Sequence, residues 1–501
     1  MESRVVLSDR NPHRCRCCST VARRDFMATL GLTALGASLG AVESALAAPA
    51  GASAKPRVRA VFVRQKTDRY FMGWPGAAYD VKARQADYTR VLANAAKMLG
   101  VDLELSQEPV TELGQISDLL NQCAEKPPDG VILISMCLNT SWDKITQFVT
   151  KRPPTLPVIV YSPKGTSFLD NVQRIAECTK GTKTFLASTS DVDWLEHAVR
   201  MLHTHAQIKR TRICVVQGNR PVDLVLEKLG STLRYVHFHR FSEEYKQVAA
   251  SDEVRAMADL YAAKAQKTVE PSGEDVLNAA KMYVVCRRVM EAEGCDGIAV
   301  DCLPHVRGRT TPPPCLAFCR LNDEGRIAAC QADWPAAISL RLVWLLLNRP
   351  GFMQNNCVDT TRNTLMGSHC TCPLRLEGPD KAPAPFILRS HAESDLGAVP
   401  QVLWPVGKEV TIMKFSDTAW WAAPKHPASC ASSILLGTGR VVRNIDNPPS
   451  GGCRTSLEVR LDGIDDVRKL KYLHHQLIVL GDHKERLRAY CELAAIDVQT
   501  V

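Results

Sequence analysis

One stretch of the sequence, residues 330–373, decides the fold of the rest; it runs CQADWPAAISLRLVWLLLNRPGFMQNNCVDTTRNTLMGSHCTCP. Its apolar residues 335–347 predict one buried helix, and an Arg-Pro-Gly turn ends that helix because proline lacks an N–H donor and glycine permits a tight turn. Gln331 precedes the helix, and Asn355 follows a short strand expected at 351–353. We therefore expect these two amides, 24 residues apart, to reach one cleft.

Short β-branched runs alternate with amphipathic helices before this stretch, and the expected helix Val81–Leu99 is one example. Such alternation predicts mostly parallel sheets covered by helices on both faces. We expect two Rossmann-like α/β layer domains, at residues 57–182 and 183–373. Short alternating runs between Pro, Gly and Asp turns follow, among them a strand at Glu409–Phe415. They predict a β-rich, barrel-like C-terminal domain at residues 374–501.

The first 47 residues are typical of a twin-arginine export signal. Arg23 and Arg24 precede a weakly apolar run, and small residues near Ala47 form a cleavage pattern. The pattern predicts a periplasmic protein if the signal is used and a cytoplasmic protein otherwise. An amphipathic leader that happens to contain two arginines is the alternative. Beyond this segment, no apolar run reaches the roughly 18 residues that a membrane span needs.

Composition and missing motifs disfavour several functional classes. The formal charge of +9 is spread along 501 residues without a basic stripe or interleaved aromatic residues, which disfavours nucleic-acid binding. The sequence lacks glycine-rich phosphate loops and the G-x-S-x-G elbow, which disfavours nucleotide-dependent enzymes and serine hydrolases. The absence of repeats disfavours a structural envelope protein. The cysteines of the mature chain show no small-domain disulfide spacing and are interpreted as structural thiols.

The segments around Gln331, Asn355 and His475 resemble the L-fucose and L-arabinose isomerase-like proteins. In that family a glutamate before such a helix, an aspartate 24 residues later and a late histidine bind a divalent metal, and these positions fall on the three residues just named. His391, in the sequence PFILRSH, matches a histidine of the arabinose branch. The resemblance implies aldose–ketose isomerisation of a pentose or 6-deoxyhexose through an enediol. It also implies Mn²⁺ or another divalent cation, and a homo-oligomer in which a neighbour covers the cleft.

This sequence departs from that pattern at two of the three metal positions. The resemblance assigns catalytic roles to Gln331 and Asn355, but amides are neutral and do not accept a proton near pH 7. The change removes about two negative charges from the metal's ligands, which weakens the case for tight Mn²⁺ binding. Asp333 is a candidate replacement acid if the chain before it is extended, and it also has the position of a helix N-cap ahead of Pro335. A non-catalytic sugar-binding or sensing protein is therefore the alternative to an isomerase.

Three more side chains are candidates for contacts with a small-molecule sugar. His369 lies in GSHCTCP and His391 lies at an expected strand end, where site residues of α/β proteins often occur. Trp420 belongs to a tryptophan pair that could stack on a sugar ring. Each also has a plainer interpretation as a packed residue, and His475 in its apolar run has the same alternative.

Overall fold

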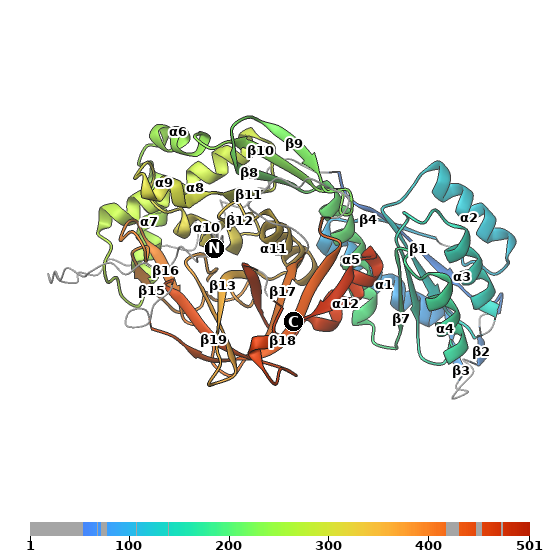
Figure 1. The fold of residues 1–501 in the computed structure, drawn as a ribbon. Helices are drawn as coiled ribbons and strands as arrows, with labels where there is room; N and C mark the ends of the chain where they lie inside the picture. The colour runs from blue at the N-terminus through green and yellow to red at the C-terminus, as the bar shows by residue number, and fades with distance from the viewer. Residues whose placement is uncertain are drawn as a thin grey trace, which may run out of the picture.

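The structure, a computed structural model, describes residues 54–67, 69–71, 78–106, 108–138, 140–416, 430–446, 453–471 and 474–501. The expected export leader and Trp420 lie outside these residues. Two parallel α/β sheets are followed by an antiparallel β-barrel (Figure 1). The fold class predicted from the alternating pattern is confirmed.

The first sheet contains five parallel strands, in the spatial order β4 (Asp102–Leu105), β1 (Arg57–Val63), β5 (Gly130–Ser135), β6 (Val158–Ser162) and β7 (Thr184–Ser188). Its helices are α1 (Val81–Leu99), α2 (Gly114–Glu125), α3 (Thr140–Lys151), α4 (Leu169–Cys178) and α5 (Asp193–Arg210). Helices α1 and α5 cover one face and α2, α3 and α4 the other. All six residues of β5 are buried, as a sheet covered on both faces requires. A short hairpin, β2 (Arg69–Phe71) and β3 (Ala78–Asp80), precedes α1.

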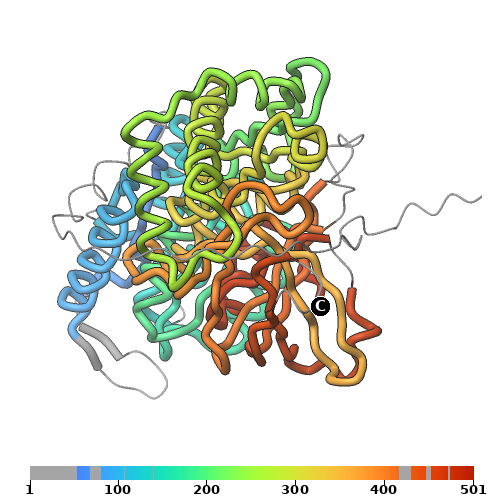
Figure 2. The backbone as a smooth tube through the Cα atoms, turned by 90° about the vertical axis from the view of Figure 1, so that its left-hand side faces the viewer, coloured from blue at the N-terminus to red at the C-terminus, as the bar shows by residue number. Residues whose placement is uncertain are grey.

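The second sheet has the order β12 (Ile327–Cys330), β11 (Gly297–Val300), β8 (Arg212–Gly218), β10 (Thr232–His237) and β9 (Val222–Val225), with β9 antiparallel at the edge. Its helices are α6 (Arg240–Gln247), α7 (Asp252–Lys264), α8 (Gly273–Ala292), α9 (Cys302–Arg307), α10 (Cys315–Asp323) and α11 (Trp334–Leu347). Helices α7 and α8 lie side by side on one side of the molecule (Figure 2).

Six antiparallel strands close into a barrel because β17 pairs with both β20 and β18. In spatial order they are β17 (Glu409–Phe415), β20 (Gln476–Leu480), β13 (Phe352–Asp359), β14 (Thr364–His369), β19 (Thr455–Leu461) and β18 (Ser433–Asn444). The strand β21 (Asp497–Thr500) pairs with β18 in parallel, and the hairpin of β15 (Phe386–Arg389) and β16 (Val399–Val402) lies beside the barrel. Closure leaves the six-stranded wall without a free edge.

The strand expected at 351–353 is wrong in length, because β13 runs from Phe352 to Asp359. Asn355 therefore lies inside this strand, opposite Ser368 of β14. A run of polar side chains in β13 suggests a strand end, but backbone pairing in the barrel wall continues through it. Both β13 and β14 belong to the barrel, upstream of the β-rich domain expected at 374–501. The domain bounds themselves stay a prediction.

Helix α11 is the apolar rod expected from the sequence, and twelve of its fourteen residues are buried. The Asp333 carboxylate caps it by accepting a hydrogen bond from the Ala336 N–H at 2.8 Å, and Asn348 ends it with a left-handed φ of 53°. The helix contacts β8, β11 and β12 on one side and β17 and β20 on the other. The Ser339 hydroxyl accepts a hydrogen bond from the Phe415 N–H of β17 at 3.0 Å. The rod thus joins the second sheet to the barrel.

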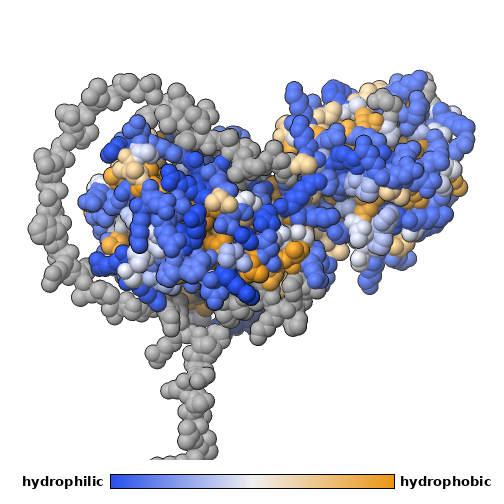
Figure 3. Space-filling model, turned by 90° about the horizontal axis from the view of Figure 1, so that it is seen from above, coloured by the Kyte–Doolittle hydropathy of each residue, from blue (hydrophilic) through white to orange (hydrophobic). Residues whose placement is uncertain are grey.

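The last helix, α12 (Lys484–Ala494), returns from the barrel to pack against β7 of the first sheet (Figure 1). A groove lined by Phe185, Trp194 and Arg488, among others, marks this junction. Seen from above, the molecule has two lobes, the first α/β unit and the second α/β unit with the barrel, and hydrophilic residues cover most of the visible face (Figure 3). In the part of the chain that the structure describes, no helix combines the length and hydropathy needed to cross a bilayer.

We predict that Gly325→Ala destabilises the protein more than Gly463→Ala does. Both glycines have a left-handed φ, of 73° and 70°, so both changes carry a similar backbone cost of about 1–2 kcal/mol. A Cβ at Gly325 would lie 2.0 Å from Cε2 of Trp344 in α11, whereas a Cβ at Gly463 has no atom within 4 Å. Overpacking at Gly325 should cost roughly a further 1–3 kcal/mol. Urea unfolding of the two variants measures the difference, and equal unfolding midpoints would contradict the packing argument.

Candidate functional site

One small pocket, with a cavity of about 20 Å³, gathers four of the side chains predicted for the site: Gln331, Asn355, His369 and His391. It lies where the end of β12 meets barrel strands β13 and β14 and the loop between β15 and β16. The remaining lining consists of apolar side chains, five cysteines and one acid: Leu303, Val306, Pro313, Cys302, Cys315, Cys330, Cys370, Cys453 and Glu393. The convergence expected for Gln331 and Asn355 is therefore present.

Gln331 reaches the pocket through an unusual turn directly after β12. Gln331 and Ala332 both have left-handed φ values, of 55° and 54°, and the Asp333 N–H donates to the Cys330 carbonyl at 3.1 Å. Each non-glycine residue in this region costs about 1–2 kcal/mol. Strain of this kind collects at functional sites, where the surrounding structure enforces it. The Oε1 atom of Gln331 lies 3.3 Å from Nε2 of His474, and this contact holds the amide group in place.

Asn355 presents an unused hydrogen-bond acceptor. Its Oδ1 atom is buried and has no hydrogen-bond partner among the described residues. Its neighbour across the ladder, Ser368, bonds instead to the Ser456 hydroxyl at 2.6 Å. A buried acceptor without a donor costs about 1–3 kcal/mol. A water molecule or a ligand hydroxyl in the pocket would remove that cost.

His369 is a neutral imidazole. Its Nδ1 atom accepts a hydrogen bond from the Cys370 N–H at 2.9 Å and lies 3.1 Å from the Thr371 hydroxyl. Burial lowers the pKa of His369 to about 4. Since Nδ1 is an acceptor, the ring proton is on Nε2, and His369 has one N–H left to donate.

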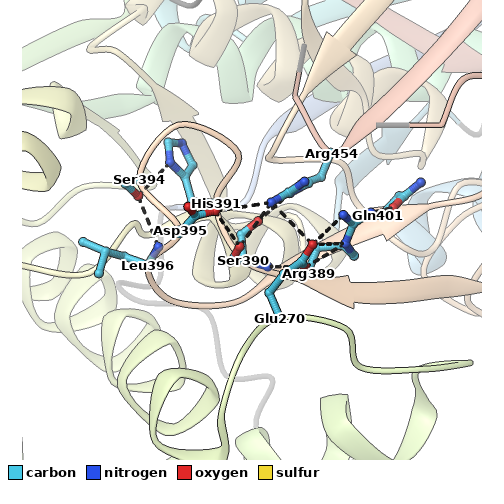
Figure 4. Close-up of polar contacts among 9 residues, drawn as sticks. All are labelled: Glu270, Arg389, Ser390, His391, Ser394, Asp395, Leu396, Gln401 and Arg454. Atoms are coloured by element: carbon cyan, nitrogen blue, oxygen red, sulfur yellow. Dashed lines mark hydrogen bonds and ion pairs between the residues drawn. The ribbon is translucent and has the colours of Figure 1, made fainter. Parts of the chain in front are cut away.

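His391 lies on a loop that salt bridges hold to the second α/β unit (Figure 4). Its Nδ1 atom lies 3.1 Å from the Ser394 hydroxyl. The preceding residues are anchored by Glu270, whose carboxylate accepts from Nε of Arg389 at 2.8 Å and from the Ser390 N–H at 3.2 Å. Burial alone would raise the pKa of Glu270, but the Arg389 hydrogen bonds and nearby arginine charges lower it, so the anchor is ionised. The loop position of His391 is thus fixed by a charged clamp.

Asp333 and His475 lie behind the pocket wall and interact with each other. The Oδ2 atom of Asp333 lies 2.8 Å from Nδ1 of His475 and accepts from Nζ of Lys414 at 2.6 Å. Asp333 and His475 are fully buried, and burial lowers the pKa of Lys414, an effect that Asp333 opposes. Burial also holds the pKa of His475 well below its usual range. The Asp333 carboxylate is therefore committed to the helix cap, Lys414 and His475, and is not an open base.

The donor set does not fit a hard divalent cation. Gln331 and Asn355 offer only neutral carbonyl oxygens to a cation. Across the described ranges, no group of three or more His, Cys, Asp or Glu side chains is arranged to hold a metal ion. The metal roles that the resemblance assigns to Gln331 and Asn355 are therefore not supported by their chemistry.

Two features of the site were missed by the sequence analysis: the ion pair of Lys414 and the cysteines of the pocket. Lys414, buried opposite Asp333, lies between Met413 and Phe415 in β17, and nothing in that strand pointed to an ion pair. Five cysteines line the pocket, although isolated cysteines suggest packing. Cys302 directly follows the strand expected at 297–301, and the end of that strand was the available signal. Trp420 lies outside the described residues, so its sugar-stacking role stays a prediction.

Comparisons with known proteins give a distant relationship. No family model matches the chain. It is 22% identical over 268 residues to the sulfoquinovose isomerases of Priestia aryabhattai and Priestia megaterium, an alignment covering 52% of this chain and 55% of each relative. The chain thus spans about half the length of the curated relatives it matches. A specific link to the L-fucose or L-arabinose isomerases is not shown.

A solved structure of GanP, a glucose-galactose binding protein from Geobacillus stearothermophilus, overlaps 58% of this chain and 90% of its own. Its sequence identity is 14% and its TM-score is 0.16, which is too low to carry an argument. The chain is therefore distantly similar in sequence to a sugar isomerase.

Proposed function

We propose that the pocket binds a sugar through neutral amide and imidazole groups, on a scaffold related to sugar isomerases, without metal-dependent isomerisation. The observation that carries this proposal is the commitment of Asp333 to Lys414 and His475. The acid nearest Gln331 is thereby removed from proton transfer. The distant similarity to sulfoquinovose isomerases supports a sugar as the ligand class.

The pocket chemistry suits hydroxyl groups. Gln331 and Asn355 each offer an acceptor oxygen and an NH₂ donor, and His369 offers one N–H. Sugar hydroxyls donate and accept in the same way, so a hydroxyl that enters the pocket would meet these groups without a buried charge. The unpartnered Oδ1 of Asn355 is the best-placed acceptor for a ligand hydroxyl.

Isomerisation is the second candidate, favoured by the similarity to sulfoquinovose isomerases. The reaction needs an acid and a base beside adjacent carbons, and usually a cation that holds two sugar oxygens. Glu393 is the one carboxylate among the described side chains that line the pocket, and it is exposed. A single exposed acid without a partner supports this candidate less well than recognition.

We also propose that the protein acts after export by the twin-arginine route and as a homo-oligomer. The arginine pair near residue 23 and the family resemblance support these two points. Fractionation of expressing cells tests the export, and native mass spectrometry of the purified protein tests the oligomeric state.

Sugar affinity should depend on Asn355 and not on added metal. We expect Asn355→Ala to weaken binding about 10- to 100-fold, because the buried acceptor contributes roughly 1–3 kcal/mol. Asn356→Ala is the matched control, since alternation places its side chain on the other face of β13, where its Nδ2 donates to Gln476. Calorimetry with L-fucose, L-arabinose and sulfoquinovose, with and without EDTA, measures the effect. Ketose formation that EDTA abolishes would favour the isomerase instead.

Restoring two carboxylates should create metal affinity. We expect Gln331→Glu with Asn355→Asp to bind Mn²⁺ at least about 10-fold more tightly than the natural protein, because two anionic oxygens would face one cation. Electron paramagnetic resonance titration of Mn²⁺ measures the difference. Gln331→Glu with Asn356→Asp carries the same charge on opposite faces of the wall and should not gain affinity. Equal affinities of both variants would disprove the shared position of residues 331 and 355.

Neutral imidazoles also predict a pH dependence of stability. Burial lowers the pKa of His369 from 6.5 to about 4, so the unfolded chain binds this proton before the folded protein does. The free energy of unfolding should therefore fall as the pH drops from about 6.5 to about 4, by up to about 1.4 kcal/mol per pH unit for this group. His369→Asn keeps an acceptor for the Cys370 N–H but does not titrate. Urea unfolding between about pH 7 and about pH 5 should show that the free energy of unfolding changes less with pH in the variant. An identical pH dependence would refute the lowered pKa of His369.

A further inference from the structure

The five cysteines of the pocket have no part in the proposed sugar contacts. All sixteen cysteines of the described residues are thiols. Cys302, Cys315, Cys330, Cys370 and Cys453 come from different segments and line the same wall. A concentration of thiols beside a ligand pocket is chemistry that packing alone does not require, since any small apolar residue would fill the space.

Two of these thiols touch. The Sγ atoms of Cys302 and Cys330 are 3.1 Å apart, and both side chains are buried. Cys330 ends β12, and Cys302 begins α9 directly after the neighbouring parallel strand β11. A disulfide needs the two sulfurs about 1 Å closer, at about 2.05 Å. Backbone pairing holds Val300 beside Cys330, so Cys302, two residues later, already lies close to Cys330.

The position of the pair links it to the pocket. Cys330 immediately precedes Gln331, whose left-handed turn directs the chain from β12 to α11. A bond from Cys330 to Cys302 would fix the start of that turn to the start of α9. Leu303 and Val306 of α9 line the pocket as well. The bond would therefore hold two sides of the pocket at one separation.

We propose that Cys302 and Cys330 form a thiol–disulfide exchange site in the pocket wall, which small soluble disulfides oxidise and thiols reduce. One cysteine attacks the small disulfide, forms a mixed disulfide and releases one small thiol. The second cysteine then attacks the protein sulfur of the mixed disulfide and releases the second small thiol. The two protein thiols are oxidised, the small disulfide is reduced, and the two protons end on the two released thiols. The predicted export route leads to a compartment where disulfides persist, which agrees with such a site.

A consequence rests on the proposed function: closing the bond would restrain Gln331 and change the affinity for sugar. Calorimetry of the oxidised and reduced protein measures this part. This measurement does not test the disulfide itself. If the protein binds no sugar, disulfide mapping alone decides whether the exchange site exists.

The test is disulfide mapping of the full-length protein. The protein is incubated with cystamine, alkylated, digested and analysed by mass spectrometry. We expect one linked peptide pair containing Cys302 and Cys330, which dithiothreitol separates, while the exposed Cys178 and Cys357 serve as alkylation controls. Recovery of Cys302 and Cys330 as alkylated thiols, or a bond between another pair such as Cys315 and Cys370, would overturn the proposal.

Two further measurements keep the test independent of any one variant's folding. Phenylarsine oxide, which bridges two adjacent thiols with loss of water, should bind the natural protein and lose at least about 10-fold in affinity in Cys302→Ala. Cys286→Ala is the matched control, since Cys286 is a buried thiol of α8 outside the pocket. Equal arsenical binding by the two variants would contradict the pairing of Cys302 with Cys330.

Discussion

The rest of the structure depends on the contacts of one buried group, the carboxylate of Asp333. It caps α11, accepts from Lys414 of β17 and meets His475 just before β20. One side chain thus connects the second α/β unit to two barrel strands. A fully buried charge is expensive to desolvate, and removing one partner of such a pair typically costs about 3–5 kcal/mol. The three partners make this position tolerable, and they also fix the register between helix and barrel.

That commitment shapes the pocket. The turn through Gln331 ends at Asp333, and His474 and His475 are held in place on the opposite side. The acid two residues after Gln331 is held by the helix cap, Lys414 and His475, and amides and the neutral imidazole of His369 line the pocket beside one exposed acid. Such a lining recognises hydroxyl groups well and moves protons poorly. Recognition is therefore the chemistry that this arrangement favours.

Much of the fold was readable because local and global preferences agree. Helix α1 has the predicted bounds Val81–Leu99, and β17 has the predicted bounds Glu409–Phe415. Asp333 and Pro335 predict the start of α11, because aspartate is a favoured N-cap residue and proline is favoured in the first turn of a helix. In each case the periodicity of the apolar residues matches the burial that the tertiary structure imposes.

The rest depends on contacts that sequence patterns do not encode. The polar residues of β13 form a strand because the barrel supplies neighbours on both sides: β14 follows it directly in the chain, and β20 is distant in sequence. The ion pair joins residues 81 positions apart, and Lys414 looks like a surface residue in its own strand. The approach of Gln331 and Asn355 was expected from the apolar helix between them, whereas the place of His391 beside them was expected from a family resemblance. The thiol pair needs the parallel order of β11 and β12 before its closeness is visible.

The return of α12 to the first sheet has a consequence for synthesis. The chain emerges from the ribosome with its N-terminal end first, so the strands and helices of the first α/β unit are complete long before residues 484–494 appear. Until then, the groove beside β7 that Phe185 and Trp194 line has no cover from Ala489 and its neighbours in α12. Nascent chains would present this apolar strip to chaperones during most of translation. The appearance of α12, and not completion of the first unit, would set the moment at which this groove can be covered.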